Sequence, residues 1–337
     1  MKDLRHYSLL AHNTFGIDAL CDRFVEFSSV EELQDALRSL HPSSPLLIIG
    51  EGSNLLLTRD FPGVVLHSSI KGRQLVSEND DNVLLRCGSG ETWDDVVAFC
   101  VENGWHGAEN LSLIPGEVGA SAVQNIGAYG AEAKDLIYKV EAVEIGTGNK
   151  VEFFNSDCMY AYRDSRFKHD WKNRFVITHV TYCLSKVFTP DLDYGNIRTS
   201  LQQKGIEKPT AAQLRQTIIE IRQSKLPDPK VTGNAGSFFM NPIVQRKVYE
   251  SLAAQYPDMP HYVVDEARVK IPAGWMIEQC GWKGRSLGKA GVHDRQALVL
   301  VNRGGATGHD VVNLYEHIIA DVRDKFGIEI HPEVNVI

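Results

Sequence analysis

Short apolar runs bounded by glycine or proline recur in the first half of the chain. Three of these runs predict buried strands, because consecutive apolar residues between turn residues are typical of them: 44–50, 63–70 and 82–90. Residues 138–154 form two β-rich runs around a glycine-containing turn, which predicts a hairpin. The segment 175–185 alternates apolar and polar residues, so we expect a strand with one wetter face.

Other segments carry apolar residues at helical spacing. In 92–104, Thr92 and Asp95 have the spacing of an N-terminal cap, and Gly104 supplies a stop. The later part of the chain is predicted to hold helices at 246–257, 273–284 and 308–327, with a strand at 296–302 and a terminal strand at 328–337 that Pro332 interrupts.

The segment 210–229 marks a change in character. Thr210 and Gln213 form a capping box before a long apolar stripe, and Pro227 and Pro229 end the helix, so a domain boundary is placed near here. Strands and helices are interspersed without strict β–α–β alternation, and the fold class is therefore predicted to be α+β.

Composition narrows the class of protein further. A chain of 337 residues has room for two or three compact units, and 43% hydrophobic with 23% charged residues is typical of a soluble protein. A net charge of -8 without basic runs argues against a nucleic-acid surface, and no stretch predicts a membrane span. No signal peptide is recognisable, and the six scattered cysteines predict reduced, mostly buried thiols in a cytoplasmic protein. No His or Cys spacing predicts a metal site.

Two glycine-rich segments are candidates for binding an anionic ligand. In Gly50–Asn54, two glycines after a strand suit a nest of converging N–H groups, although a plain turn explains them equally well. Leu113–Gly130 holds four glycines and a proline among small residues, with Gln124 and Asn125, and Glu117 is its one charged residue. A ligand-binding loop is favoured there over a merely compact one.

Several polar residues have suitable chemistry but little local context. The guanidinium of Arg163 is suited to a carboxylate or phosphate, yet an ion pair with Asp164 is the simpler interpretation of that stretch. Lys225 and Arg222 fit a solvated basic helix end, and Glu333 an exposed terminal strand.

Ser237 lies within the stretch GNAGSFFMNP, without the Gly-x-Ser-x-Gly pattern of a nucleophile elbow. Taken alone, this stretch favours a turn that enters a strand, with Ser237 as an ordinary loop residue. The alternative is a reactive hydroxyl presented on a tight backbone.

Taken in order, the motifs of this chain are NTFG, GEGSN, IPGEVGASAVQNIGAYG, YRDSRFK, KLPDPKVTGNAGSFFMNP, AGWMIEQCGWKG and PEV. This series resembles the UDP-N-acetylenolpyruvoylglucosamine reductase family, FAD enzymes that make UDP-N-acetylmuramate for bacterial cell walls. The resemblance runs from about Asn13 to the end of the chain. The segment DLDYGNI resembles the tyrosine-bearing loop of the longer form of this enzyme.

The resemblance implies a two-part FAD-binding fold of the vanillyl-alcohol-oxidase (PCMH) type and a substrate-binding α+β domain. The implied parts are residues 1–70 joined by 327–337, residues 71–205, and residues 206–326. Some oxidases of this fold attach flavin covalently through a histidine in the first glycine loop, whereas this chain has Ser53 and Asn54 there, so non-covalent FAD is expected.

The resemblance also implies which residues bind the ligands. FAD is expected to contact Gly50, Gly52, Ser53, Asn54, Pro115, Gly116, Gly119, Ala120, Ser121, Gln124, Asn125, Gly127, Ala128, Tyr129 and Gly130. The UDP-sugar is expected to contact Tyr162, Tyr194, Arg222, Lys225, Asn241 and Gln296. NADPH is the expected co-substrate, with no nucleic acid, membrane or protein partner implied.

The implied reaction reduces an enolpyruvyl ether to a lactyl ether, with NADPH as reductant and FAD as mediator. Arg163 suits the stabilisation of charge that develops on the substrate carboxylate. Glu333 is expected to be protonated in the closed complex or to share a proton with that carboxylate. Ser237 is expected to protonate the carbon next to it, because a weak acid can serve a strongly basic carbon.

Two departures from the family pattern stand out. Glu117 occupies the second glycine loop, where a carboxylate facing a pyrophosphate would repel it, so its side chain is expected to point away. His331 and Asn335 flank Glu333 in place of an acid and an arginine. Two alternative functions stay open on the sequence: a flavin oxidase of the same fold and a non-catalytic UDP-sugar binder.

Overall fold

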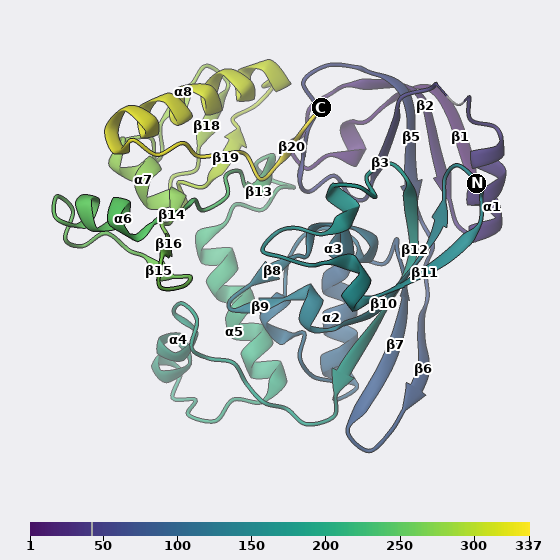
Figure 1. Cartoon of the computed structure of the whole chain (residues 1–337), viewed down its shortest axis with the longest axis horizontal. Helices are drawn as coiled ribbons and strands as arrows, with labels where there is room; N and C mark the ends of the chain where they lie inside the picture. The colour runs from purple at the N-terminus through teal and green to yellow at the C-terminus, as the bar shows by residue number, and fades with distance from the viewer. Residues whose placement is uncertain (42) are drawn as a thin grey trace. The chain divides into compact units, whose positions relative to one another are not determined.

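The computed structural model describes residues 1–41 and 43–337, in which the chain divides into two compact units (Figure 1). Unit 1 comprises residues 1–7, 21–51 and 62–224, and unit 2 comprises residues 8–20, 52–61 and 225–337. Both units are discontinuous in sequence, because the chain passes from one to the other several times. The last passage falls between Ser224 and Lys225, at the end of a long helix.

The first sheet of unit 1 has the strand order β1–β2–β5–β3. Its elements are β1 (Lys2–Ser8), β2 (Leu20–Phe27), β5 (Phe61–Ser68), β3 (Leu46–Ile49) and the covering helix α1 (Val30–Arg38). Strands β3 and β5 run parallel, with Ile48 opposite Leu66. Leu33 of α1 is fully buried in the apolar cluster that this helix forms with the sheet. The predicted strands at 44–50 and 63–70 are confirmed.

The second sheet of unit 1 is antiparallel throughout, in the order β11–β10–β12–β7–β6. Its elements are β11 (Lys150–Phe154), β10 (Ile137–Glu144), β12 (Phe175–Ser185), β7 (Asn82–Gly88), β6 (Arg73–Glu78) and the helices α2 (Trp93–Glu102) and α3 (Val118–Gln124) on one face (Figure 1). The buried rings of Trp93 and Tyr182 meet edge to face there, 5.5 Å apart. The predicted hairpin is confirmed. The wetter face of β12 is present but only half exposed, at His179 and Cys183.

The remaining elements of unit 1 connect these sheets and end in a helical pair. They are β8 (Gly127–Ala128), β9 (Ala131–Glu132), α4 (Ile197–Gln203), α5 (Ala211–Lys225) and the 3-10 turns Glu109–Leu111, Ala133–Asp135, Asn155–Cys158 and Arg166–Lys168. The predicted capping box of α5 is confirmed: Thr210 N donates to Gln213 Oε1 at 2.9 Å, and Gln213 N donates to Thr210 Oγ1 at 3.2 Å. Leu201 and Ile218 join α4 to α5 in one apolar cluster.

Unit 2 contains a four-stranded sheet in the order β13–β19–β18–β17 and a smaller one in the order β14–β16–β15. Its elements are the 3-10 turn Leu10–His12, β4 (Leu55–Leu56), β13 (Asn234–Ser237), β14 (Ile243–Gln245), α6 (Arg246–Ala253), β15 (Tyr262–Val263), β16 (Arg268–Lys270), α7 (Ala273–Gln279), β17 (Ser286–Leu287), β18 (Ala290–Val292), β19 (Val299–Asn302), α8 (Gly308–Phe326) and β20 (Asn335–Val336).

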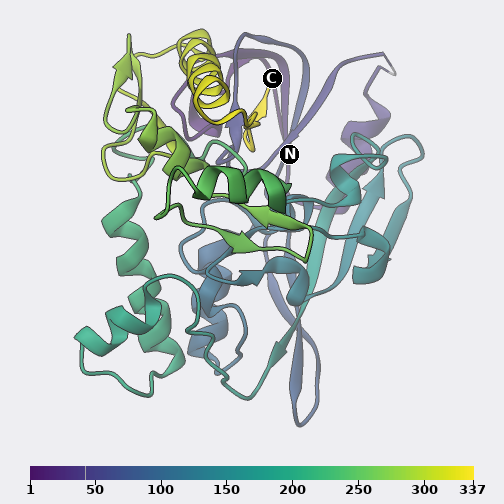
Figure 2. The same ribbon diagram turned by 60° about the vertical axis from the view of Figure 1, so that its left-hand side comes forward.

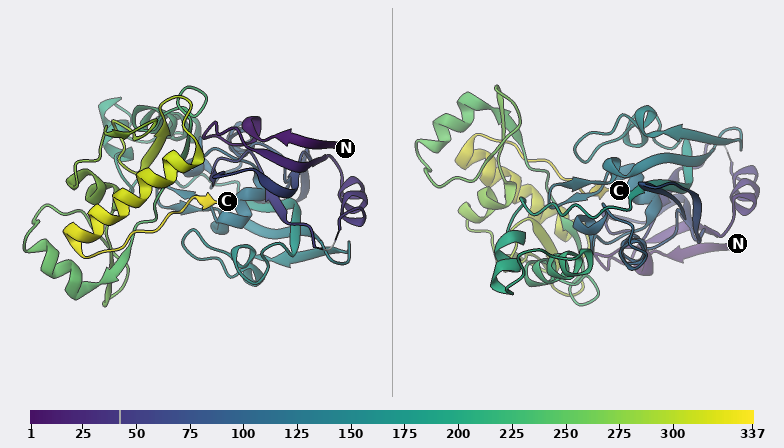
Figure 3. Two further views of the ribbon diagram at one scale, coloured as in Figure 1. Left: turned by 90° about the horizontal axis from the view of Figure 1, so that it is seen from above. Right: turned by 90° about the horizontal axis from the view of Figure 1, so that it is seen from below.

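The helix α8 lies against the four-stranded sheet of unit 2 (yellow in Figures 2 and 3). Thr307 caps it by accepting from Asp310 N, and Leu314, Ile318 and Val322 are fully buried on its inner face. The C-terminal segment leaves α8 and pairs through β20 with β4, in parallel. The last residues of the chain are therefore fixed beside the residues that follow the first glycine-rich segment.

Three local predictions need correction. Thr92 makes no side-chain cap, and the carboxylate that orders this region is Asp94 rather than Asp95. The helices predicted at 246–257 and 273–284 end early, at Ala253 and Gln279. The terminal strand is limited to Asn335–Val336. Pro332 has no N–H to donate, and the N–H groups of Glu333 and Val334 donate to Phe238 O instead.

Two global properties follow from the structure. Across residues 1–41 and 43–337, no helix combines the length and the apolarity that crossing a bilayer requires. Four cysteines are buried and two are half-buried, which confirms the prediction of mostly buried thiols.

Asp94 joins three segments of unit 1. Its carboxylate accepts from Leu113 N at 2.6 Å and from Arg215 of α5 at 2.9 and 3.0 Å. We predict that Asp94→Asn lowers the free energy of unfolding by about 1.5–3 kcal/mol, the usual range for hydrogen bonds to charged groups. Urea denaturation measures this value. The neighbouring exposed Asp95 is the matched control, and Asp95→Asn should change stability by less than about 0.5 kcal/mol.

Candidate active site

The first glycine-rich segment is shaped by a close approach that only glycine permits. Gly52 has a φ of +71°, and a Cβ there would lie 2.1 Å from the carbonyl oxygen of His12. Asn54 Nδ2 donates to the backbone oxygen of Glu333 at 3.4 Å, and Asn54 O accepts from Asn335 N at 3.1 Å. Within unit 2, the structure thus brings two predicted site residues together, Asn54 and Glu333.

The second glycine-rich segment meets the first one within unit 1. Glu51 Oε2 accepts from Gly116 N at 2.9 Å. A Cβ on Gly50 would lie 3.0 Å from Glu117 Oε2 and 3.7 Å from the Cβ of Ala120. The glycine at position 50 therefore leaves space between the turn and the start of α3, and the two segments predicted to bind one ligand are neighbours.

Some predicted ligand contacts have structural partners in the chain. Ser121 is buried, donates to Val118 O and bonds the hydroxyl of Tyr182 at 2.8 Å. Asn125 is also buried, with a φ of +44°, and its Nδ2 donates to Ala161 O at 2.7 Å. These two side chains fix the loop, whereas neighbouring Gln124, Gly127, Ala128 and Tyr129 are half-buried.

Glu117 does turn aside, toward β5. Its Oε1 lies 3.2 Å from Nε2 of His67, whose Nδ1 lies 3.1 Å from Glu26 Oε2. The side chain is expected to point away from the pyrophosphate, and the contact with His67 accounts for one of its two oxygens. Its other oxygen, Oε2, faces Gly50.

Two arginines of unit 1 approach the second glycine-rich segment. Arg163 has a φ of +56°, and its Nη2 donates to Gly127 O at 2.6 Å. Its guanidinium also lies over the ring of Tyr162, 5.6 Å from the centroid. A positive φ at a non-glycine residue costs energy, and such strain is common at functional sites.

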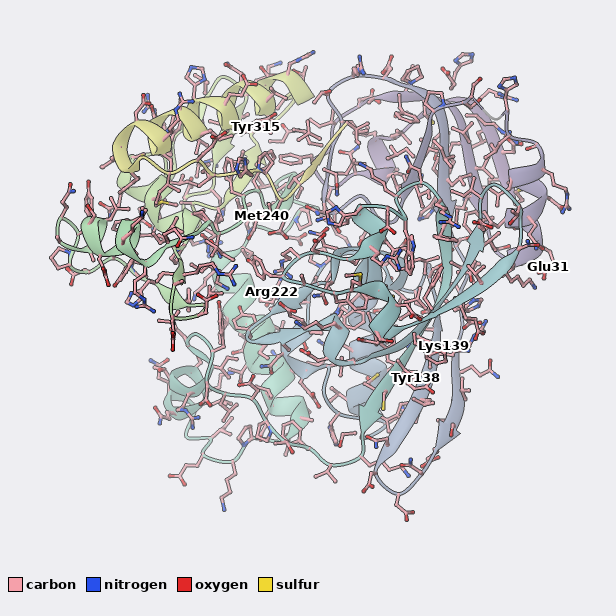
Figure 4. All side chains as sticks on the ribbon, viewed as in Figure 1. Glu31, Tyr138, Lys139, Arg222, Met240 and Tyr315 are labelled. Atoms are coloured by element: carbon pink, nitrogen blue, oxygen red, sulfur yellow. The ribbon has the colours of Figure 1, made fainter. Side chains whose placement is uncertain are left out.

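Arg222 projects from the last turn of α5 (Figure 4). Its Nε is buried and has no hydrogen-bond partner among residues 1–41 and 43–337. Burial lowers the pKa of this guanidinium, and the charge of Arg163 lowers it further, while Tyr129 and Asp94 oppose the shift. Burial likewise raises the pKa of Tyr129. A buried guanidinium N–H without a partner is suited to an anionic ligand.

The tyrosine loop is fastened to the second glycine-rich segment. Asn110 is buried, and its Nδ2 donates to Tyr129 O at 2.9 Å and to Asp191 O at 3.1 Å. The rings of Tyr129 and Tyr194 meet edge to face, with centroids 6.4 Å apart. Asn110 therefore helps to hold the loop that carries Tyr194, and no motif in the sequence marks Asn110 for this role. Its partners lie 19 and 81 residues away, so no local pattern reveals the role.

In unit 2, backbone hydrogen bonds hold the Ser237 segment on both sides. Ser237 ends β13 opposite Val299, and Phe238 N donates to Leu298 O at 2.7 Å. On the other side, Glu333 N donates to Phe238 O at 2.7 Å. The Ser237 side chain is exposed and Glu333 is half-buried. The structure thus places the backbones of these two predicted catalytic residues next to each other.

Two phenylalanines follow Ser237 in the chain. Phe238 and Phe239 are buried in the interior of unit 2, where the Phe238 ring lies 5.2 Å from that of Tyr315 on α8 (Figure 4). They anchor the strand end instead of lining an exposed surface. Both rings are buried, so they tie the segment to the core of unit 2, whereas the adjacent Ser237 is exposed.

The remaining predicted substrate residues are distributed along unit 2. Asn241 Oδ1 accepts from Ala273 N at 2.9 Å, at the start of α7. Gln296 Oε1 accepts from Leu298 N at 3.3 Å, just before β19, the strand that pairs with β13. Lys225 is exposed at the end of α5. Asn241 and Gln296 therefore order the backbone around the Ser237 segment.

The glycine-rich turns suit the diphosphate of a nucleotide cofactor, which points to the class of nucleotide-cofactor-binding proteins. Comparison with known families agrees with that class. Residues 21–153 match the family model described as "FAD binding domain". Residues 228–337 match the model described as "UDP-N-acetylenolpyruvoylglucosamine reductase, C-terminal domain".

Whole-chain comparisons give the family. The chain is 57% identical to a UDP-N-acetylenolpyruvoylglucosamine reductase of Bacteroides fragilis, over 98% of this chain and 99% of that protein. It is 45% identical to the reductase of Flavobacterium johnsoniae, over the full length of both. The crystal structure of the Thermus caldophilus reductase has the same fold, with a TM-score of 0.69 at 20% identity, covering 99% of this chain and 98% of that one. The chain belongs to the UDP-N-acetylenolpyruvoylglucosamine reductase family.

The protein is therefore an FAD-dependent oxidoreductase, a UDP-N-acetylmuramate dehydrogenase. It reduces UDP-N-acetylglucosamine enolpyruvate to UDP-N-acetylmuramate with NADPH, a step in peptidoglycan precursor synthesis. This assignment selects the reductase over the two alternatives that the sequence left open. The predicted PCMH-type FAD-binding fold with a second α+β domain is confirmed.

The tyrosine loop generates a prediction about substrate binding. We expect saturating UDP-sugar substrate to slow proteolytic cleavage near Tyr194, because a lid that closes on its ligand becomes less accessible. Asn110→Ala removes the hydrogen bond to Asp191 O in this loop and the one to Tyr129 O, and it should speed cleavage several-fold in the absence of substrate. Limited proteolysis with mass spectrometry measures both effects.

The control for this prediction is Asn103, whose exposed amide donates to Phe99 O at the end of α2. Asn103→Ala should leave cleavage near Tyr194 unchanged. Equal cleavage with and without substrate would show that the loop is not a lid.

Proposed function

We propose that FAD is held without a covalent bond by the two glycine-rich segments. The observation that supports this is the cradle itself, in which a Cβ would fill the space at Gly50 and collide with backbone at Gly52. The residues proposed to contact FAD are Gly50, Gly52, Ser53, Asn54, Pro115, Gly116, Gly119, Ala120, Ser121, Gln124, Asn125, Gly127, Ala128, Tyr129 and Gly130. When bound, FAD carries a hydride between NADPH and the enolpyruvyl sugar.

Arg163 is proposed to bind the carboxylate of the enolpyruvyl group. Hydride addition at the vinyl CH2 carbon drives electron density into that carboxylate, and a guanidinium stabilises the resulting charge while remaining protonated. The hydrogen bond from Nη2 to Gly127 O fixes the orientation of the guanidinium against the second glycine-rich segment.

Glu333 is proposed to be protonated when the substrate is bound, or to share a proton with the substrate carboxylate. An ionised carboxylate beside a developing enolate would oppose the reaction. Its backbone N–H is fixed on Phe238 O, so its position relative to the Ser237 backbone is fixed as well.

Ser237 is proposed to protonate the carbon next to the substrate carboxylate. Support comes from its placement: an accessible hydroxyl at a strand end whose backbone is held between Leu298 and Glu333. A hydroxyl stays protonated at neutral pH, and a carbanion-like acceptor is basic enough to take its proton.

The UDP part is proposed to bind Tyr162, Tyr194, Arg222, Lys225, Asn241 and Gln296. The buried, unsatisfied Nε of Arg222 is the observation that supports an anionic group there. We further propose a cytoplasmic enzyme that needs no nucleic acid, membrane or protein partner. Its three parts are proposed as residues 1–70 with 327–337, 71–205 and 206–326.

The cofactor proposal predicts a yellow protein that releases intact FAD. Acid precipitation should leave the flavin in the supernatant, because neither Ser53 nor Asn54 offers the histidine that a covalent link uses in some oxidases of this fold. Absorbance and mass spectrometry of both fractions measure the distribution. Flavin that remained with the precipitate would refute non-covalent binding.

The role of Ser237 predicts a split between the two half-reactions. Ser237→Ala removes one oxygen from an exposed side chain, so folding and FAD content should be retained. Reduction of the bound flavin by NADPH needs no proton donor to carbon and should proceed at nearly the wild-type rate. Reoxidation by the enolpyruvyl sugar should be slower by about a hundred- to ten-thousand-fold, the usual effect of losing a general acid.

Anaerobic stopped-flow absorbance measures both half-reactions separately. Ser251→Ala, which alters another exposed serine of unit 2, should leave both rates unchanged. A comparable loss in both half-reactions would assign Ser237 a structural role, and no loss in either would remove it from the mechanism.

A further inference from the structure

A buried histidine lies between two carboxylates beside the second glycine-rich segment. His67, on β5, has Nδ1 at 3.1 Å from Glu26 Oε2 and Nε2 at 3.2 Å from Glu117 Oε1. A neutral imidazole carries one N–H and can donate to only one carboxylate, whereas an imidazolium donates from both nitrogens. Two ionised acceptors on opposite sides of one ring therefore select the protonated form.

The surroundings of His67 support this charge state. Burial of the ring disfavours protonation, but the carboxylates of Glu117 and Glu26 outweigh it and raise the pKa of His67 above its ordinary value. Glu26 is also paired with Lys2 of β1 at 2.6 Å. Burial raises the pKa of Glu26, but Lys2 and His67 outweigh this and lower it overall. Phe24 stacks against the ring and adds no charge.

These four residues form a row of alternating charge that ends at the cofactor segment. Lys2, Glu26, His67 and Glu117 together sum to zero. Glu117 is the only charged residue in Leu113–Gly130, and its Oε2 lies 3.0 Å from the position a Cβ on Gly50 would take. Without a compensating cation, this carboxylate would repel a diphosphate brought to either segment.

We propose that His67 is a positioning residue for FAD: as an imidazolium it turns Glu117 toward β5 and cancels its charge, so that the two glycine-rich segments accept an anionic diphosphate. This inference rests on the proposed assignment of those segments to FAD. It predicts a pH dependence of cofactor affinity that resides in the protein, because the diphosphate of FAD stays ionised across the same range.

The sign of this dependence follows from the raised pKa. Below it, His67 is protonated and FAD binds tightly. As the pH rises through it, above the ordinary value of 6.5, the proton is lost and affinity falls by at most about tenfold per pH unit, the limit for one proton. The carboxylates of Glu26 and Glu117 face the ring, and the lowered pKa of Glu26 keeps that group ionised across this window.

The experiment measures the dissociation constant of FAD from the fluorescence released on serial dilution of the holoenzyme, between pH 6 and pH 9. Four proteins are compared: wild type, His67→Gln, Glu117→Gln and the double variant. The affinity of the wild-type protein for FAD should fall as the pH rises. His67→Gln should bind FAD about tenfold or more weakly at pH 6, since it loses a charged hydrogen bond to Glu117, and its profile should be flat.

The double variant separates charge compensation from packing. If His67 acts by cancelling Glu117, removing both charges restores the affinity lost in His67→Gln, and Glu117→Gln alone shows little pH dependence. If the double variant binds as weakly as His67→Gln, the proposal is wrong and His67 matters through packing. Circular dichroism checks that each variant is folded, and the near-isosteric Glu117→Gln tests the pH profile even if His67→Gln does not fold.

Two further variants complete the design. His317→Gln changes an exposed histidine on α8 and should reproduce the wild-type pH profile. Ala120→Glu places an uncompensated carboxylate on α3, and it should weaken FAD binding if the second glycine-rich segment contacts the cofactor. Unchanged affinity in Ala120→Glu would overturn the assignment of that segment. A weakened Ala120→Glu together with parallel pH profiles for wild type and Glu117→Gln would overturn only the role of His67.

Discussion

Anion binding by an acidic protein is the constraint on which the site depends. The chain carries a net charge of -8, yet FAD, NADPH and the UDP-sugar are all anions. Positive charge must therefore be concentrated where these ligands bind. In unit 1, Arg163 and Arg222 act on each other electrostatically, and burial makes the second of them costly to keep charged without a ligand. The same constraint accounts for a carboxylate in the cofactor segment being paired with His67.

Backbone contacts fix the positions of several segments that contain predicted site residues. Gly52 lies so close to the His12 carbonyl that any side chain would collide, and the amide and carbonyl of Phe238 are bonded to Leu298 and Glu333 on either side. Such contacts fix the position of atoms that a ligand meets, at little cost in side-chain entropy. Asn125, an expected FAD contact, also supports the backbone through its hydrogen bond to Ala161 O.

Supporting residues connect the loops that are proposed to bind different ligands. Asp94 ties the start of the second glycine-rich segment to α5, which carries Arg222. Asn110 ties the end of the same segment to the tyrosine loop. The segments of unit 1 that are proposed to bind the cofactor and the substrate are thus attached to common side chains, so a change at Asp94 or Asn110 is expected to affect both ligands.

The sequence by itself determined the local elements and the family. The strands at 44–50 and 63–70 and the capping box at Thr210 depend on residues within a few positions, and motif order was specific enough to select Ser237 as a candidate. Only the tertiary structure decided the partners of Glu117 and of Asn110. Those partners come from strands and loops far along the chain, and folding rather than spacing brings their atoms within hydrogen-bond distance.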